Sequence, residues 1–275
     1  MIEAVTSTAP PFSGAIDIEP HGVSGRYHAE LGDQWVIGGK AHGGLLLVLL
    51  VRAGLAELAG DPGQGAELDP LAVSADFLRA PDPGPVEMTA EVIKRGRTAS
   101  VVHVRMEQAG KAVLTASLTA GALPDGGPRW ADLPDLPAEP PADALDPGAD
   151  GRSGVSSACD IRLDRSTLGF ARGEAGDPVV RGWARPREEP SSLLFALLAS
   201  DALPPTVFNV GGTVGWAPTV QFHALLRADP APGWLRLETR STLVSDTWFD
   251  EEATVVDSAG RLVCQSRQLA LAPKT

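Results

Sequence analysis

The sequence contains the same order of predicted elements twice, and this repetition constrains the fold more than any other feature. "HGGLLLVLLVRAGLAELAG" at 42–60 and "SSLLFALLASDAL" at 191–203 are both apolar helix patterns. Strand patterns follow each helix, and overlaying "FLRAPDPGP" on "LLRADPAPG" aligns Arg79 with Arg227 at an offset of 227 − 79 = 148. Overlaying "QAGK" on "SAGR" aligns Gly110 with Gly260 at an offset of 260 − 110 = 150. This small drift over four strands indicates an internal duplication.

Each repeat predicts one long helix followed by an antiparallel sheet. In the first repeat, strands are expected at 71–78, 86–95, 100–108 and 112–120, separated by the turn sequences "PDPGP", "GRT" and "QAGK". The helix is apolar nearly all round, so it must be buried on most sides. A sheet that curls around its own helix provides that burial, and an α+β protein with two such units is predicted.

The segment between the repeats is rich in Pro, Gly, Ala and Asp and has no periodic apolar pattern. Such a composition is typical of a connection and not of a core element. The predicted organisation is an N-terminal unit at 1–122, a linker at 123–154 and a C-terminal unit at 155–275.

Charge and composition narrow the classes of partner. The net charge of −12 and the pI near 4.8 disfavour nucleic acid, which requires concentrated Lys and Arg. Cys159 and Cys264 have no paired spacing, which predicts a reduced, cytoplasmic protein. The first 30 residues lack a basic start followed by an apolar run, and "LLLVLLV" at 45–51 is far shorter than the roughly 20 residues that span a bilayer. Neither a signal peptide nor a membrane partner is expected.

Gln268 is the first candidate site residue. In the predicted strand "GRLVCQSRQLAL" it falls on the face that carries small and apolar residues. At the offset of 150 it overlays Leu118, so the fold accepts an aliphatic side chain at this position. The alternative interpretation is that the carboxamide only bonds a neighbouring backbone group.

Asp201 is the second candidate. It shares 3-4 helical spacing with Leu194, Leu197 and Leu198, which predicts an acid near the C-terminal end of an apolar helix. The overlay aligns it with Ala53 or Arg52, so the first repeat has no acid there. The alternative interpretation is a helix-terminal Asp that is turned to solvent.

The duplicated unit, together with "HGGLLLVLL", "SADFLRAPDPGP" and "LVCQSRQLAL", resembles the double-hotdog acyl-CoA thioesterases of type II over roughly residues 20–272. The resemblance implies that an Asp, a Thr or Ser and a Gln hold and activate a water molecule. Asp201 and Gln268 match this pattern, whereas Gly215 stands where the family has its hydroxyl. Thr219 is the better substitute because it heads the strand, although it also fits an ordinary β-branched strand residue.

These residue types suit hydrolysis of a thioester. A partly desolvated carboxylate is a stronger base toward water, and a carboxamide can accept and donate hydrogen bonds at once. His42, Gly43 and Gly44 begin a helix, and its backbone N–H groups are expected to bind substrate by stabilising the oxyanion. The same glycines equally fit close helix packing.

The resemblance implies an acyl-CoA thioesterase of fatty-acid metabolism. No metal or other cofactor is expected, because coenzyme A is part of the substrate, and a homo-oligomer could form through the sheets. The basic cluster "KRGRTAS" at 94–100 could meet coenzyme A phosphates or be a solvated hairpin turn. A catalytically silent acyl-CoA or acyl-carrier binding module is the main alternative. A hydratase is disfavoured, since His42 and Glu57 are too far apart on one helix.

Overall fold

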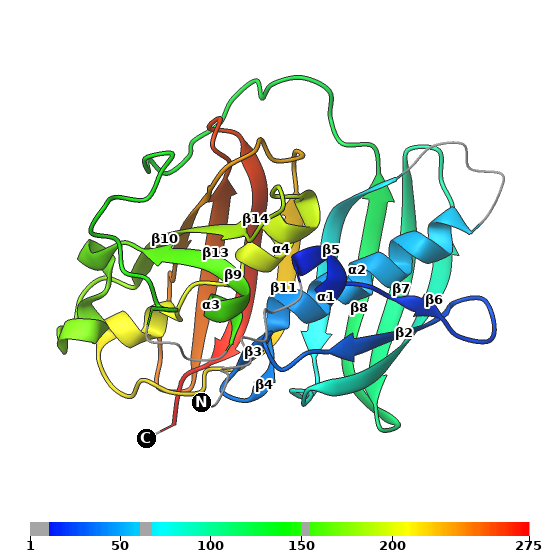
Figure 1. Cartoon of the computed structure of the whole chain (residues 1–275), viewed down its shortest axis with the longest axis horizontal. Coiled ribbons are helices and arrows are strands. Elements are labelled where there is room, and N and C mark those ends of the chain that lie inside the picture. The colour runs from blue at the N-terminus through cyan, green and yellow to red at the C-terminus, as the bar shows by residue number, and fades with distance from the viewer. Residues whose placement is uncertain (1–10, 61–67, 150–153, 275) are drawn as a thin grey trace, which may run out of the picture.

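The computed structural model describes residues 11–60, 68–149 and 154–274, and its centre is one antiparallel sheet of twelve strands. The strand order is β1-β2-β6-β7-β8-β5-β11-β14-β13-β12-β10-β9. The first half of the chain contributes the six strands up to β5, and the second half contributes the six from β11 onward. The two halves lie side by side in Figure 1, with α2 and α4 on the same side of the sheet.

The first half contains two helices and a run of strands. They are α1 (Phe12–Ala15), β1 (Glu19–Pro20), β2 (Arg26–Leu31), β3 (Val36–Ile37), β4 (Lys40–Ala41), α2 (Gly43–Ala59), β5 (Asp69–Phe77), β6 (Gly84–Lys94), β7 (Ala99–Gln108) and β8 (Lys111–Gly121). The strands β3 and β4 pair with each other outside the main sheet. The predicted long helix and the four predicted strands are confirmed, with ends that differ by one or two residues.

The second half repeats this order with a much shorter main helix. Its elements are α3 (Val155–Ala158), β9 (Cys159–Leu163), the 3-10 turns η1 (Arg165–Thr167) and η2 (Gly169–Arg172), β10 (Val179–Pro186), α4 (Leu193–Ala199), the 3-10 turn η3 (Thr206–Val210), β11 (Thr219–Leu226), β12 (Leu235–Arg240), β13 (Trp248–Val256) and β14 (Leu262–Leu271). Asp201 was expected inside this helix, but the helix ends at Ala199. Asp201 lies in the turn that follows, where its N–H bonds the carbonyl oxygen of Leu198.

Strand pairing confirms the internal duplication. Leu118 pairs with Val73 on β5 and Val102 on β7, and Gln268 pairs with Phe222 on β11 and Glu251 on β13. The offsets are 268 − 118 = 150, 222 − 73 = 149 and 251 − 102 = 149. Each position in one half of the sheet thus has a defined counterpart in the other half.

The long helix α2 is buried because protein covers nearly its whole circumference. It packs against β5, β6, β7 and β8 of its own half and against α4 of the other half. Every residue from Leu45 to Val51 is at most 1% exposed. This explains why the helix lacks a polar stripe. The shorter α4 likewise packs against β10, β11, β12 and β14 of its own half, so each half of the sheet covers its own helix, as predicted.

The segment between the repeats runs along the second half of the sheet without a strand of its own over the described residues 122–149. Leu136 is buried with Trp183 and Trp234, and the Trp183 indole donates to the carbonyl oxygen of Pro137 at 2.8 Å. The proposed boundaries at 122 and 154 stay a prediction, and residues 150–153 lie outside the described part.

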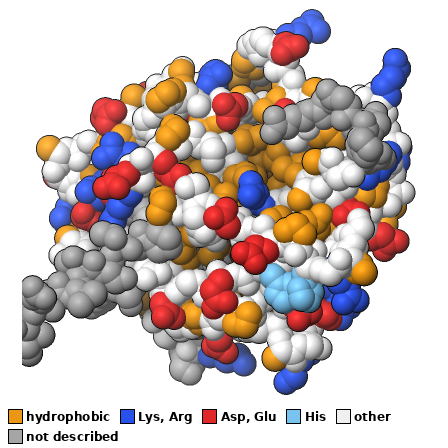
Figure 2. All heavy atoms as spheres, turned by 45° about the vertical axis from the view of Figure 1, so that its right-hand side comes forward, with side chains coloured by type: hydrophobic (Ala, Val, Ile, Leu, Met, Phe, Trp, Pro, Cys, Tyr) orange, Lys and Arg blue, Asp and Glu red, His pale blue; other side chains and the backbone are white. Residues whose placement is uncertain are grey.

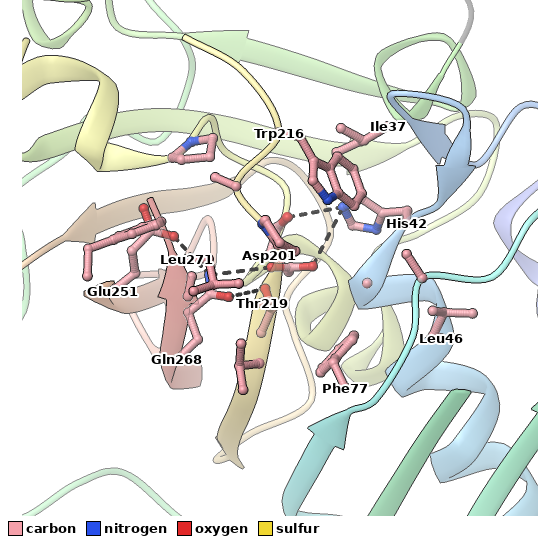
Figure 3. A pocket seen from close by; sticks show the side chains of 18 of the residues that line it. Ile37, His42, Leu46, Phe77, Asp201, Trp216, Thr219, Glu251, Gln268 and Leu271 are labelled. Atoms are coloured by element: carbon pink, nitrogen blue, oxygen red, sulfur yellow. Dashed lines mark hydrogen bonds and ion pairs between the residues drawn. The ribbon is translucent and has the colours of Figure 1, made fainter. Parts of the chain in front are cut away.

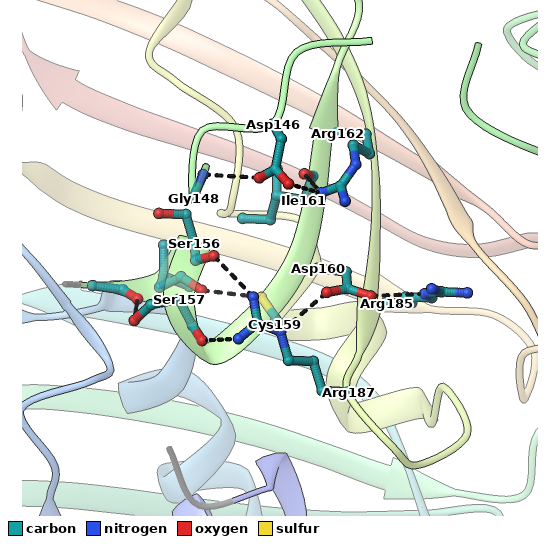
Figure 4. A network of polar contacts seen from close by, with 12 residues as sticks. Asp146, Gly148, Ser156, Ser157, Cys159, Asp160, Ile161, Arg162, Arg185 and Arg187 are labelled. Atoms are coloured by element: carbon teal, nitrogen blue, oxygen red, sulfur yellow. Dashed lines mark hydrogen bonds and ion pairs between the residues drawn. The ribbon is translucent and has the colours of Figure 1, made fainter. Parts of the chain in front are cut away.

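An ionic network holds β9 against β10 and the preceding segment (Figure 4). Asp160 accepts from Arg185 and Arg187, each at 3.0 Å, and Asp146 pairs with Arg162 at 2.9 Å. Burial opposes the charge of Asp160, but the two arginines outweigh it and lower the pKa of this carboxyl. The network therefore ties β9, the last strand in the order of the sheet, to its neighbour β10 and to the segment before it.

Acidic and basic side chains are interspersed over the face shown in Figure 2, around a central gathering of hydrophobic side chains. Among the described residues, no helix is both long and apolar enough to cross a membrane.

Candidate active site

A pocket of roughly 500 Å³ lies where the two halves of the chain meet. The N-terminal end of α2 and the end of β5 form one side, and the turn after α4 with β11, β13 and β14 forms the other. Its lining is mostly apolar, with Ile37, Leu46, Phe77, Phe208, Trp216 and Leu271 among its members. Figure 3 shows a row of polar side chains, namely His42, Asp201, Thr219, Gln268 and Glu251, that converges on this apolar space.

Asp201 occupies the centre of the row. Its Oδ1 lies 3.5 Å from Nε2 of Gln268, and its Oδ2 lies 3.9 Å from Nε2 of His42. The side chain is only 14% exposed. Burial raises the pKa of Asp201, although His42, a backbone hydrogen bond from Gly44 and the carboxamide of Gln268 oppose the shift. Asp201 is accordingly a stronger base than an exposed aspartate.

His42 connects the first half of the chain to Asp201. Its Nδ1 accepts from the backbone N–H of Leu45, which caps α2, and its Nε2 lies 3.0 Å from the carbonyl oxygen of Asp201. This pattern requires the neutral tautomer with the proton on Nε2. Burial lowers the pKa of His42, in agreement with a neutral ring. In this arrangement His42 holds the turn that carries Asp201.

Gly43 and Gly44 allow the halves to approach closely. A Cβ on Gly43 would lie 2.7 Å from Oδ2 of Asp201, and one on Gly44 would lie 2.7 Å from the carbonyl oxygen of Leu198. The N–H of Gly44 bonds Asp201 and that of Leu45 bonds His42, so these two donors already have partners. The structure thus supports the packing role of the glycines, and Gly43 also lines the pocket.

Thr219 and Gln268 are joined at the adjacent ends of β11 and β14. The Thr219 hydroxyl donates to Oε1 of Gln268 at 2.5 Å, and Gln268 is 8% exposed. Gly215 also lines the pocket, but it contributes no hydroxyl, and a Cβ there would meet only ordinary contacts at 3.8 Å or more. The residue expected to substitute for the family hydroxyl is therefore the one that contacts Gln268.

Glu251 is a member of the site that the sequence analysis missed. Its Oε2 accepts from Nε2 of Gln268 at 2.8 Å, and its Oε1 accepts from the N–H and hydroxyl of Thr206 at 2.6 and 2.9 Å. Burial raises the pKa of Glu251 to about 7, despite these hydrogen bonds. The duplication contained a signal for it, because Glu251 pairs with Gln268 in the second half and the equivalent residues of the first half, Val102 and Leu118, are both aliphatic.

The basic cluster at 94–100 does not belong to this site. Arg95 donates to the carbonyl oxygens of Leu58 at 3.0 Å and Glu57 at 3.2 Å, at the C-terminal end of α2. His42 is at the opposite end of this 17-residue helix, about 25 Å away at 1.5 Å per residue. The cluster lies in the turn between β6 and β7, where Arg95 bonds the last carbonyl groups of the helix, and a contact with coenzyme A phosphates stays a prediction.

Across the described ranges, no group of three or more His, Cys, Asp and Glu side chains could hold a metal ion. Cys159 and Cys264 are free and buried, and burial raises the pKa of each thiol to about 12.

Two helix-and-sheet units in one chain, with a row of polar groups at their junction, define a double-hotdog protein. The family model described as acyl-CoA thioesterase N-terminal domain matches residues 31–121, and the one described as acyl-CoA thioesterase C-terminal domain matches residues 131–272. The chain belongs to the acyl-CoA thioesterase family.

Individual relatives agree with this membership. An uncharacterised protein of Mycobacterium tuberculosis H37Rv is 39% identical over 267 residues, which cover 90% of this chain and 91% of the relative. A crystal structure described as a candidate thioesterase II from Thermobifida fusca YX is 34% identical, with a TM-score of 0.81 and coverage of 96% and 97%. A hotdog-fold protein of unknown function from Alicyclobacillus acidocaldarius, 22% identical over 96% of this chain and 98% of that one, has a TM-score of 0.80 and shares the fold.

Proposed function

We propose that this protein hydrolyses an acyl-CoA thioester to a free acid and coenzyme A, with water activated by Asp201, Gln268 and Thr219. One observation carries the proposal: a largely buried carboxylate, a carboxamide and a hydroxyl converge on an apolar pocket. The duplicated fold supplies the comparison, because Leu118 occupies the place of Gln268 in the other half.

Asp201 acts as the general base in this proposal. It takes one proton from the water as the water oxygen attacks the thioester carbonyl carbon, and its raised pKa favours that transfer. The tetrahedral intermediate then expels the coenzyme A sulfur, which recovers the proton from Asp201. The N-terminal end of α2, where Gly43 lines the pocket, carries a partial positive charge that would stabilise the oxyanion.

The lining of the pocket supports an acyl chain as the group that is held. Trp216 and Ile37 lie on the His42 side in Figure 3, and Phe77 and Leu46 lie below them. Trp216 is 46% exposed and Ile37 is also 46% exposed, so both have apolar surface that a ligand can cover. Burying such surface contributes about 25 cal/mol per Å². Coenzyme A enters as part of the substrate, and the proposal needs no further cofactor.

Release of free thiol from a panel of acyl-CoAs tests the proposal. We expect release by the wild type, and a loss of about 100-fold or more for Asp201→Asn and for Gln268→Ala. Gln265→Ala is the matched control, because Gln265 is an exposed residue on the same strand. Equal rates for Asp201→Asn, Gln268→Ala and wild type would overturn the assigned site.

The same panel separates the proposal from the silent binding module. Gly215 at the family's hydroxyl position is the observation that favours a silent module. Acyl-CoA binding by the wild type without thiol release would establish that alternative. The hydroxyl of Thr219 beside Gln268 favours hydrolysis.

The cellular setting belongs to the same proposal. The two free thiols support a reducing, cytoplasmic location, and membership of the acyl-CoA thioesterase family supports a role in fatty-acid metabolism. A homo-oligomer formed through the sheets is likewise a proposal, which light scattering of the purified protein would test.

A further inference from the structure

Glu251 contacts the carboxamide of Gln268 directly. It sits on β13 opposite Gln268 on β14, and it is 5% exposed. Thr206 holds its other oxygen through two hydrogen bonds, and the Thr206 hydroxyl also meets the hydroxyl of Ser241 at 2.5 Å. A buried carboxylate with three hydrogen bonds to fixed neighbours is a rigid acceptor.

A glutamine carboxamide has two ends of nearly equal shape, so its surroundings decide which end faces which neighbour. Thr219 does not decide, because a hydroxyl can donate or accept. Asp201 contributes weakly, since its Oδ1 is 3.5 Å from the carboxamide nitrogen. Glu251 does decide, because an ionised carboxylate at 2.8 Å accepts only and therefore requires Nε2 on its side.

We propose that Glu251 is a positioning residue that fixes the orientation of the Gln268 carboxamide and, through it, the hydroxyl of Thr219. The inference rests on the function proposed for this site. With Nε2 toward Glu251, Oε1 takes the hydroxyl proton of Thr219. Thr219 then presents oxygen lone pairs to the pocket, as Asp201 does. A water that donates to both oxygens keeps its own lone pair for the thioester carbon.

The reverse orientation would remove this arrangement. If the carboxamide turned over, Nε2 would donate to Thr219, whose hydroxyl proton would then point toward the pocket. That proton would bind the lone pair that the water needs for attack. The other half of the chain shows that the fold does not require the polar pair, because Val102 and Leu118 stand there instead.

Protonation of Glu251 would favour the reverse orientation, because a carboxylic acid can donate. Burial brings the pKa of Glu251 to about 7, so this change falls near neutral pH. The titratable groups beside it are Asp201, in the turn after α4, and His42, which touches Asp201 from α2. From η3 and from the residue after β12, Thr206 and Ser241 contribute uncharged hydroxyls.

Glu251→Gln is the decisive variant. The carboxamide that replaces the carboxylate would keep its oxygen on the two donors of Thr206. Its nitrogen would then face Nε2 of Gln268, and to avoid two donors facing each other the Gln268 carboxamide would turn over. We expect kcat to fall about 30-fold or more, with KM within about threefold, because the loss falls on the reacting geometry. Glu252→Gln is the matched control, since the adjacent Glu252 side chain is 46% exposed and should retain wild-type rates.

A double variant and a spectrum separate positioning from other roles. In Glu251→Gln combined with Gln268→Ala, we expect the rate of Gln268→Ala alone, because the first change acts through the second residue. The side-chain amide NMR signal of Gln268 should shift in Glu251→Gln and titrate near pH 7 in the wild type. The inference would be overturned if the rate losses of Glu251→Gln and Gln268→Ala multiplied in the double variant. It would also be overturned if the Gln268 amide signal changed neither in Glu251→Gln nor with pH.

The NMR readout needs no hydrolysis. If the wild type released no thiol from any acyl-CoA, the proposed function would fail, while the titration of the Gln268 amide would still show whether Glu251 controls its orientation. If the wild type hydrolysed acyl-CoA and Glu251→Gln matched it, only the role of Glu251 would fail.

Discussion

Nε2 of His42 lies 3.0 Å from the carbonyl oxygen of Asp201, so one side chain links the start of α2 to the turn after α4. Removing this ring leaves that carbonyl without its partner and also takes away the cap of α2. The link therefore joins the stability of the fold to the position of the proposed base, and it gives the first prediction.

His42→Ala should lower the free energy of unfolding by about 2–4 kcal/mol at pH 7.5, from the lost cap and the cavity that remains. The folded pKa of His42 is lowered, so the unfolded chain binds more protons below its ordinary pKa of 6.5. The stability that His42 contributes is therefore lost as the pH falls below 6.5, and the free energies of unfolding of the wild type and the variant should approach each other there. Urea unfolding at several pH values measures it. His223→Ala, at an exposed position, is the control, and an equal loss in both variants would contradict the assignment.

Glu251→Gln should stabilise the protein at high pH while it slows the reaction. The pKa of about 7 in place of 4.5 means that the buried carboxylate costs about 3 kcal/mol when ionised. As the pH rises from 4.5 through about 7, Glu251 ionises in the wild type and the free energy of unfolding falls by this amount. The variant should therefore be more stable than the wild type at pH 8 and similar to it near pH 4.5. Thermal unfolding at both pH values is the measurement. A variant that is less stable at pH 8 would show that Glu251 mainly supports the fold.

Gly43→Ala and Gly44→Ala should separate activity from stability. The added methyl at Gly43 meets the movable carboxylate of Asp201 at 2.7 Å, so we expect a rate loss of about tenfold or more with little change in unfolding. The methyl at Gly44 meets the backbone of Leu198, so this variant should unfold more easily by about 2 kcal/mol. Gly60→Ala, where a Cβ lies 3.7 Å or more from other atoms, is the control. Equal behaviour of all three variants would refute the close approach.

Thr219→Val should reduce kcat by about tenfold, because the shape is retained while Oε1 of Gln268 loses its donor. Thr219→Ser keeps the hydroxyl and should retain most of the rate. Thr89→Val, on the exposed face of β6, controls for the chemical change. Steady-state thiol release measures all three, and full activity in Thr219→Val would remove Thr219 from the site.

The dependence of kcat/KM on pH should reveal the proposed base. Only the ionised form of Asp201 accepts a proton, and burial raises its pKa above the ordinary 3.8. We expect the rate to fall as pH drops, and the step that belongs to Asp201, with a midpoint above 3.8, should disappear in Asp201→Asn. A step near pH 7 that belongs to Glu251 should remain in that variant and disappear in Glu251→Gln. A profile that is the same in the wild type and Asp201→Asn would assign the titration to another group.

The fold could be predicted closely because two local signals agreed. The apolar helix at 42–60 needed cover on all sides, and the regular turns around Gly110 and Gly260 set the strand lengths. Both glycines have positive φ values, of 72° and 85°, so the aligned turns are real structural equivalents. The end of the second helix was predicted less accurately, because the apolar pattern continues past Ala199 while the backbone turns at Ser200 and Asp201.

The site was predictable only where a residue breaks the expected pattern of its own element. Gln268 and Asp201 were visible for this reason, and the resemblance to thioesterases added Thr219. Glu251 lies in "WFDEEATVV", where neighbouring acids make one more glutamate inconspicuous. Its meaning depends on which residue lies opposite, and a single strand does not encode that information. The bond from His42 to Asp201 joins residues 159 positions apart and likewise required the structure.

The sheet is continuous through β5 and β11, which pair antiparallel and so relate the halves by an approximate two-fold axis. Two identical single-unit chains joined in this way would carry every substitution twice, once on each side of the axis. A fused chain escapes this constraint, because each side can change alone. Val102 and Leu118 could remain aliphatic while Glu251 and Gln268 became polar, so covalent fusion gave the molecule the freedom to be asymmetric.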